Sequence, residues 1–327
     1  MEKSYDLKVS IIIPAKEIND YIRESISYIL NLDYQNFEII VLPDKESNET
    51  FQKTKIVSTG HIGPAEKRDK GVKLAEGEIL AFLDDDAYPR SDWLSKALLN
   101  FQNENISIVC GPGVTPKSDG FIQKASGAVY TSFLGSGNVR FRYWPHKKRF
   151  VDDFPSVNML IRKKDFEKVG GFNTSFWPGE DTKLCLDILK LGKKILYDPE
   201  VFVWHHRRAN IKEHLKQVFN YSQHRGFFAK KYPKTSLKAL YFFPSLFLLF
   251  LILMPFFIKY QSGLYVYVFV LSIYILLLII AGITEGLRYK SILIGLLVIP
   301  LIFLTHITYG IGFLLGLLKP KLISKLR

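Results

Sequence analysis

The stretch Glu78-Ile79-Leu80-Ala81-Phe82-Leu83-Asp84-Asp85-Asp86 decides the fold class, because it places three adjacent carboxyl groups directly after a short apolar run. A run of this length and composition predicts a buried strand, and the acids then fall at its carboxyl end. Neighbouring carboxylates repel one another unless a cation lies between them, and hard oxygen ligands suit Mg²⁺ or Mn²⁺. The stretch therefore predicts a divalent-cation site at a sheet edge, with an acidic turn in solvent as the plainer alternative.

Outward from that strand, short apolar runs rich in β-branched residues alternate with stretches of helical period over residues 8–113. The alternation predicts an α/β fold with a doubly wound parallel sheet. Functional sites in such sheets lie at the carboxyl ends of the strands. Glu17, Asp44 and Asp84 each follow a predicted strand, so we expect these acids to converge. The predicted strands are residues 9–14, 38–42, 55–58, 79–83 and 106–110.

The region after residue 115 is less regular, but two further segments carry signals. Residues 156–161 predict another strand, and residues 181–191 predict a helix whose apolar side chains share one face. Glu180 and Asp181 open that helix, where the helix dipole stabilises acidic side chains. The dipole explains the pair taken alone, whereas the functional alternative makes Asp181 a general base.

Three apolar runs follow Ser236, at residues 237–258, 262–282 and 291–318. Each reaches the ~20 residues that a helix needs to cross the hydrocarbon core of a bilayer. Such runs leave no polar face for water, so we expect about three transmembrane helices. Pro300 and His306 lie in the third run, which is expected to tilt, kink or break.

The charges that flank these runs predict their orientation. Basic residues cluster just before residue 237 and the loop at 285–290 is charged, so both are expected in the cytoplasm, with the loop at 259–261 outside. The charged N-terminus shows no signal peptide, so the domain that precedes the apolar runs is also expected in the cytoplasm. The basic tail at 319–327 conflicts with three spans, because it would then lie outside. Either the last run re-enters the membrane or the tail lies along the interface.

The bulk composition narrows the class of partner. The net charge of +13 is compatible with nucleic acid, but the basic residues cluster beside the apolar runs, as they do at an anionic membrane surface. A small anionic substrate also favours a positive field, and the residue spacing shows no nucleic-acid-binding module. Cys110 and Cys185 each lie in an apolar segment and are expected to be buried free thiols. We therefore expect a membrane partner and no nucleic acid.

A series of motifs runs from residue 9 to residue 205. It consists of Val9-Ser10-Ile11-Ile12-Ile13-Pro14-Ala15-Lys16-Glu17, Asp44, Gly63-Pro64-Ala65 with Arg68 and Gly71, the run at 75–86, Asn158-Met159-Leu160-Ile161-Arg162, Gly170-Gly171-Phe172-Asn173, Gly179-Glu180-Asp181 and His205. In order and spacing the series resembles the family-2 glycosyltransferases of GT-A fold. The resemblance implies that a sugar moves from a nucleotide-diphosphate donor to an acceptor in one displacement that inverts the anomeric configuration.

The resemblance also implies roles for individual residues. Asp84 and Asp86 match the D-x-D element that binds the divalent cation and the diphosphate, with Asp85 as the third acid. Asp181 matches the catalytic base. The other matched positions are Pro14, Lys16, Glu17 and Asp44 for the nucleotide base and ribose, Arg68 near the nucleotide, Glu180 beside the catalytic base, and His205 or His206 near the donor phosphates, with His205 as the third metal ligand.

Two departures from the family pattern bear on function. Asp69 stands where an asparagine often follows the arginine, and the Q-x-x-R-W element of processive polysaccharide synthases is missing after Trp204. The missing element favours the addition of one sugar or a few.

These signals together predict a membrane-anchored inverting glycosyltransferase that acts on a lipid-linked or glycolipid acceptor in surface polysaccharide or glycan assembly. The alternatives are a processive polysaccharide synthase and a catalytically silent membrane scaffold that binds nucleotide or anionic lipid. We predict an enzyme domain at residues 1–235 and a membrane domain at residues 236–327.

Overall fold

A computed structural model describes residues 6–174 and 176–322 of the chain, and these divide into two compact units. The first unit contains residues 6–114 and 144–205. The second unit contains Thr115–Tyr143 and His206–Leu322, so a segment from the middle of the chain packs with the C-terminal helices. The division at residue 235 into an enzyme domain and a membrane domain stays a prediction.

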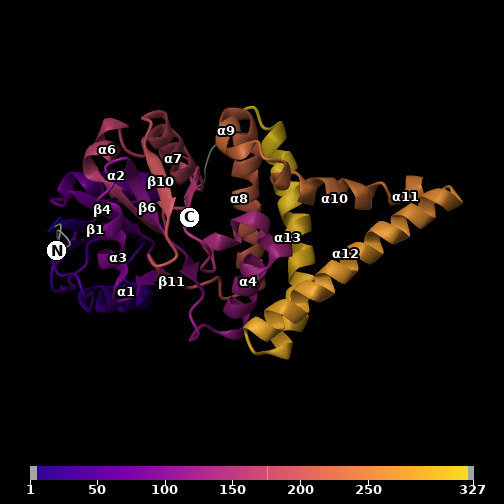
Figure 1. Ribbon diagram of the computed structural model, residues 1–327, viewed down its shortest axis with the longest axis horizontal. Helices are drawn as coiled ribbons and strands as arrows, with labels where there is room; N and C mark the ends of the chain where they lie inside the picture. Colours follow the sequence, from indigo (N-terminus) through magenta and orange to yellow (C-terminus); the bar gives the residue numbers. More distant parts are fainter. Residues whose placement is uncertain (1–5, 175, 323–327) are drawn as a thin grey trace. The chain divides into compact units, whose positions relative to one another are not determined.

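The first unit is built on a mixed eight-stranded sheet (Figure 1). Strands β3, β2, β1 and β4 are parallel, whereas β9 lies antiparallel between β4 and β6. β10 continues parallel to β6, and β8 closes the sheet antiparallel to β10. In sheet order the strands are β3 (Thr54–Ile56), β2 (Phe37–Leu42), β1 (Val9–Pro14), β4 (Ile79–Leu83), β9 (Asn158–Arg162), β6 (Ile106–Cys110), β10 (Lys194–Tyr197) and β8 (Arg149–Val151).

The predicted α/β class is confirmed, but the sheet is not wholly parallel. Apolar runs such as residues 156–161 predict a buried strand without predicting its direction. The alternation of helix and strand correctly predicted parallel pairing for β1, β2, β3 and β4. Between these strands a helix or loop carries the chain back to the edge of the sheet where the previous strand began.

Helices cover both faces of this sheet. α1 (Asp20–Leu30) and α3 (Trp93–Asn100) share one core with the odd-numbered residues of β1, such as Ile11. α2 (Pro64–Leu74) lies on the other face, where a Cβ on Gly71 would come within 2.7 Å of the Ile12 side chain. α6 (Lys163–Lys168) packs on the same face as α2 through its Phe166 ring, 5.5 Å from the ring of Phe82. α7 (Glu180–Lys190) completes the helices of this unit.

A second, small sheet in the first unit consists of β5 (Ala87–Pro89), β11 (Val203–His205) and β7 (Gly113–Val114). β11 pairs antiparallel with β5, and this register sets His205 opposite Ala87. The last residue of β11 is therefore held beside the acidic turn that follows β4.

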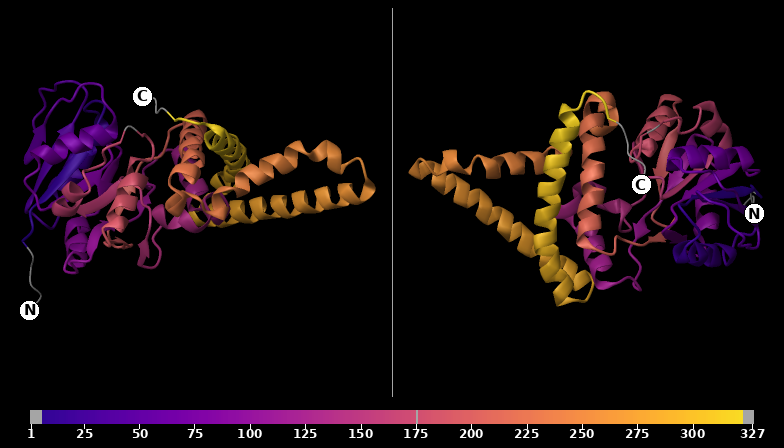
Figure 2. Two further views of the ribbon diagram at one scale, coloured as in Figure 1. Left: turned by 90° about the horizontal axis from the view of Figure 1, so that it is seen from above. Right: turned by 180° about the vertical axis from the view of Figure 1, so that it is seen from behind.

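The second unit is helical. Its long helices α8 (Ile211–Lys231) and α13 (Ile292–Leu318) lie side by side (Figures 1 and 2). The shorter elements that precede them are α4 (Phe121–Thr131), α5 (Phe133–Ser136) and the 3₁₀ turn η1 (Gly137–Arg142). Those that connect them are α9 (Pro233–Ser236), η2 (Ala239–Tyr241), α10 (Phe243–Ile252), α11 (Met254–Phe257) and α12 (Gln261–Arg288).

Among the described residues, α12 and α13 are the helices long and apolar enough to cross a membrane. The first predicted apolar run instead forms the shorter helices α10 and α11, which break at Leu253 just before Pro255. The third run continues through Pro300 as one helix. The number of spans stays a prediction, and the basic tail lies outside the described residues from residue 323 onward.

Candidate active site

The acidic turn after β4 and the end of β11 form a cluster of possible metal ligands. One ligand atom from each of Asp84, Asp86 and His205 lies within 4.8 Å of the others. His205 Nε2 lies 3.0 Å from Asp86 Oδ1. Two carboxylates and an imidazole are a donor set that suits a divalent cation, so the residues present fit the predicted metal.

Arg68 joins this cluster to the start of α7. Its guanidinium is almost fully buried and donates to Asp84 Oδ1 at 2.7 Å and to Glu180 Oε1 at 2.9 Å. Burial by itself would lower the pKa of Arg68, but the carboxylates of Asp84 and Glu180 raise it above its ordinary value. Burial raises the pKa of Glu180, and the Arg68 charge opposes that shift. The arginine therefore holds two segments 112 residues apart in one site.

Asp181 follows Glu180 in the first turn of α7. Gly179 precedes the helix with a φ of +113°, a backbone conformation that glycine adopts without strain. The Asp181 carboxylate accepts a hydrogen bond from the Thr182 backbone N–H at 2.7 Å and stays partly exposed. Because Glu180 contacts Arg68 and Arg68 contacts Asp84, Asp181 lies one residue along the chain from a side chain that is tied to the acid cluster.

The loops after β1 and β2 lie together at the same end of the sheet. Pro14 ends β1 and is buried, and Lys16 and Glu17 follow it with exposed side chains. The Asp44 backbone N–H donates to the Lys16 carbonyl at 3.0 Å, which joins the two loops. The sequence-predicted donor residues Pro14, Lys16, Glu17 and Asp44 are thus neighbours.

Lys67 is a residue of this region that sequence reasoning missed. Its buried ammonium group donates to the Ala15 carbonyl, to the Leu42 carbonyl at 3.2 Å and to the Asp44 carboxylate. His61 Nδ1 lies 3.0 Å from the second oxygen of Asp44. Burial by itself would raise the pKa of Asp44, but hydrogen bonds from His61 and Lys67 bring it below its ordinary value. One sequence signal could have identified Lys67. It precedes Arg68 in the first turns of a predicted helix, and that helix follows the ends of two predicted strands.

The two adjacent histidines have different surroundings. His205 belongs to the first unit and lies beside Asp86. His206 belongs to the second unit, where its Nδ1 pairs with the carboxylate of Asp119. The structure therefore brings His205 to the acid cluster.

Residues 10–170 match the model of a protein family described as glycosyl transferase family 2. The chain belongs to this family. The predicted family and the predicted enzyme class are confirmed.

Relatives of this glycosyltransferase extend the similarity beyond the matched segment. The chain is 25% identical to the dolichyl N-acetyl-alpha-D-glucosaminyl phosphate 3-beta-D-2,3-diacetamido-2,3-dideoxy-beta-D-glucuronosyltransferase of Methanococcus voltae, over 95% of this chain and 97% of that protein. It is 21% identical to the glucosyl-dolichyl phosphate glucuronosyltransferase of Haloferax volcanii, over 61% of this chain and 69% of that protein. The chain spans only 32% and 50% of the length of two other curated glycosyltransferases.

A solved structure is also similar to this glycosyltransferase. The mannosyltransferase PcManGT from Pyrobaculum calidifontis, in complex with GDP-Man and Mn²⁺, is 19% identical with a TM-score of 0.49. The similarity covers 68% of this chain and 62% of that protein.

The family departure at Asp69 has a structural role in this glycosyltransferase. Its two carboxylate oxygens accept hydrogen bonds from the backbone N–H groups of Phe172 at 3.0 Å and Asn173 at 3.2 Å. Burial raises the pKa of Asp69, and these two hydrogen bonds oppose the shift. Asp69, which follows Arg68 on α2, therefore holds the turn after Gly171 against this helix.

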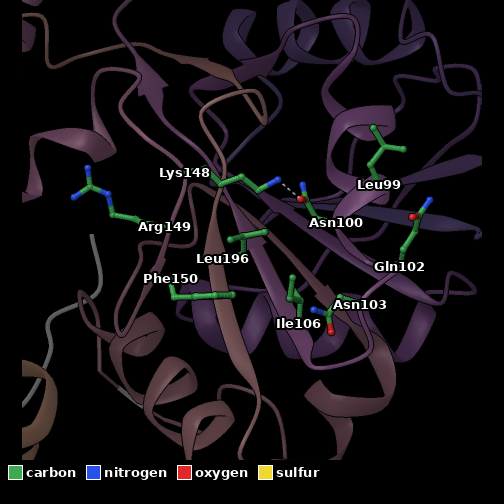
Figure 3. A pocket seen from close by; sticks show the side chains of 9 residues that line it. All are labelled: Leu99, Asn100, Gln102, Asn103, Ile106, Lys148, Arg149, Phe150 and Leu196. Carbon is green, nitrogen blue, oxygen red and sulfur yellow. Dashed lines mark hydrogen bonds between the residues drawn. The ribbon is translucent and has the colours of Figure 1, made fainter.

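A pocket of about 550 Å³ lies elsewhere in the first unit, at the edge of the sheet (Figure 3). Lys148 crosses it and donates to Asn100 Oδ1 at 2.6 Å, and it also pairs with Asp198 at 2.8 Å. Exposed apolar side chains, Leu99 and Phe150, form part of its wall. It shares no lining residue with the acid cluster, so we assign it no part in the reaction.

Proposed function

We propose that this glycosyltransferase moves a sugar from a nucleotide-diphosphate donor to a lipid-linked acceptor at a membrane, with inversion at the anomeric carbon. The observation that carries the proposal is the chain of contacts from the Asp84, Asp86 and His205 cluster through Arg68 to the start of α7. It joins a metal-type donor set to a carboxylate suited to act as a general base.

The names of two relatives support the lipid-linked acceptor. Both are described as acting on dolichyl-phosphate-linked sugars, and the Methanococcus voltae relative aligns over nearly its whole length with this chain. The alignment thus includes the C-terminal helices, which supports an enzyme that works beside a bilayer. The helices α12 and α13 are long and apolar enough to anchor it.

The donor would be held at the carboxyl ends of β1, β2 and β4. Asp84, Asp86 and His205 would hold Mg²⁺ or Mn²⁺, which stabilises the charge of the departing diphosphate when bound. Lys16, Glu17 and Asp44, together with Pro14, would contact the nucleotide base and ribose, while Asp85 would lie beside the diphosphate. Arg68 and Glu180 orient these groups through their buried ion pair.

Asp181 would take the proton from the acceptor hydroxyl as the acceptor oxygen attacks the anomeric carbon. The bond between that carbon and the diphosphate oxygen breaks in the same step, so the configuration inverts. Asp181 lies in the first turn of α7, where the helix N-terminus carries partial positive charge.

The test is a screen of the purified full-length protein against a panel of nucleotide sugars, with nucleotide release as the readout and membrane extract as the source of acceptor. We expect one donor to be turned over in the presence of Mg²⁺ or Mn²⁺, with loss of activity in a chelator. Full activity in the chelator would contradict the metal site.

The role of Asp181 is tested with Asp181→Asn, which should lower turnover by about 10²–10⁴-fold while donor binding persists. Asp187→Asn is the matched control, because Asp187 lies on the same helix and pairs with Lys183 and Lys190 away from Arg68. Equal turnover in the two variants would exclude Asp181 as the base, whereas absence of turnover in the unsubstituted protein would favour a silent scaffold.

A further inference from the structure

One face of α13 is covered by protein and the other is exposed. Val298, Leu301 and Ile302 form a buried cluster with side chains of α4 and α12. Leu296, Leu304 and Leu315 are exposed and fall on the other side of the helix. The exposed leucine face of α13 is therefore free to contact lipid, whereas the covered face is not.

The covered face of α13 is packed along much of its length against α8. His214 Nε2 of α8 lies 3.0 Å from Thr305 Oγ1. Further along, a Cβ on Gly226 would lie 2.1 Å from the Phe313 carbonyl oxygen, so the two backbones approach closely. The Lys230 ammonium donates to the Lys319 carbonyl at 2.8 Å, which fixes the C-terminal end of α13 to α8. The pair therefore stays together over this length (Figure 2).

α8 is too polar to follow α13 through a bilayer. Lys216 is exposed, and Gln217, Asn220 and Gln223 are partly exposed along the middle of the helix. Polar and charged side chains are costly in hydrocarbon. A transmembrane α13 would carry these side chains of α8 to membrane depth, so α13 and α8 together favour the membrane surface.

The two remaining apolar segments leave α13 at different points and meet far from it. At the start of α10, Ser245 Oγ donates to the Gly310 carbonyl at 3.3 Å. Near the end of α12, a Cβ on Gly295 of α13 would lie 2.6 Å from the Gly282 carbonyl oxygen. The segments meet at residues 258–260, where Lys259 is exposed, so α13 is the base of a triangle and this turn is its apex (Figure 1).

We infer that α13 lies in the plane of the membrane surface, with its exposed leucine face in the lipid and its other face under α4 and α8. The hairpin of α10, α11 and α12 enters the bilayer from this surface and directs Lys259 toward the far side, with α12 as its leg long enough to cross the hydrocarbon core. With α13 across the bilayer instead, the apex would sit at mid-depth and leave the Lys259 charge in hydrocarbon.

This placement also removes the conflict in the charge pattern. Arg288 and Lys290 precede α13, and Lys319 follows it. With α13 in the membrane plane, both groups lie on the same side as the basic α8, as the distribution of positive charge favours. The placement rests on the proposed membrane anchorage but is independent of which sugar or acceptor the enzyme uses.

The side of each loop is tested with Lys259→Cys, Lys290→Cys and Pro320→Cys in the full-length protein, labelled in intact cells with a membrane-impermeant maleimide before and after permeabilisation. The native Cys110 and Cys185 are buried, and the unsubstituted protein measures their background. We expect Lys290→Cys and Pro320→Cys to label on one side and Lys259→Cys on the other. Labelling of Pro320→Cys and Lys290→Cys from opposite sides would overturn the inference, as would labelling of all three from one side.

Depth is tested with nitroxide labels on Leu296→Cys, Leu304→Cys and Leu315→Cys in vesicles of phosphatidylcholine and phosphatidylglycerol. If α13 crossed the membrane, the first and last labels would differ in depth by up to about 28 Å from the helical rise. We expect equal depths. Matched labels on the exposed α12 residues Val266→Cys, Ile273→Cys and Ile280→Cys should show a clear gradient.

A depth gradient along α13 equal to that along α12 would overturn the inference while leaving the proposed anchorage intact. Failure of the unsubstituted protein to remain with membranes after alkaline extraction would instead overturn the anchorage and the placement together. The two failures are therefore distinguishable.

Discussion

Replacement of Arg68 by methionine should destabilise the first unit strongly, because Arg68 is the buried cation that joins two carboxyl groups. Its side chain is 3% exposed and makes charge-assisted hydrogen bonds of 2.7 and 2.9 Å. Methionine fills a similar volume but leaves Glu180, itself buried, without this partner. Removal of one member of a buried ion pair typically costs about 3–5 kcal/mol.

This loss of unfolding free energy can be measured as a fall in the melting temperature. In a folding unit of ~150–250 residues, 1 kcal/mol shifts the midpoint by about 2–4 °C. We therefore expect Arg68→Met to lower the midpoint of the first unit by roughly 6–20 °C. Arg23→Met is the control, because Arg23 is exposed and its pairs with Asp20 and Glu49 are solvated, so its loss should leave the midpoint almost unchanged.

The assay is thermal unfolding of the full-length protein in detergent, followed by near-ultraviolet circular dichroism. The double variant Arg68→Met with Glu180→Gln should recover much of the lost stability, because the uncompensated buried carboxylate is gone. Donor binding should not recover, because Asp84 still lacks its arginine. If Arg68→Met melted together with Arg23→Met, the buried ion pair would not hold α2 to α7 and the reasoning would be refuted.

Two further predictions concern residues outside the acid cluster. Asp69→Asn supplies one carbonyl oxygen where two backbone N–H groups now each find an oxygen, so it should cost about 1–3 kcal/mol, measured by the same unfolding assay. His214 is a buried histidine between Ser126 and Thr305, and burial lowers its pKa to about 4. The unfolded chain then binds a proton between about pH 6.5 and pH 4 that the native chain does not, so the stability of the second unit should fall by on the order of 3 kcal/mol as the pH is lowered through this window. His214→Gln should flatten that dependence, and an unchanged slope would contradict it.

Local sequence signals predicted the strands that surround the site. β1, β4 and β6 begin and end where the apolar runs do, because a strand buried on both faces is built mainly from apolar residues. The acids after β4 then fall at the sheet edge as a direct consequence. No tertiary information is needed for this step.

Contacts between distant segments could not be predicted in the same way. β5, β7 and β11 are two or three residues long, too short for any periodicity, yet the pairing of β11 with β5 decides that His205 lies beside the acids. The Arg68–Glu180 pair joins residues 112 positions apart. Hydropathy gave the length of α13 but not its covered face, because the helices that cover it come from other parts of the chain.

The charges of the site explain why a divalent cation and the donor should bind together. The carboxyl groups of Asp84, Glu180 and Asp181 act on the single positive charge of Arg68, and Asp86 lies within the same ligand cluster as Asp84. A nucleotide diphosphate is also an anion, so a bare diphosphate would be repelled by these acids. A divalent cation held by Asp84, Asp86 and His205 would reverse the sign of that interaction. Donor affinity should therefore depend steeply on the cation.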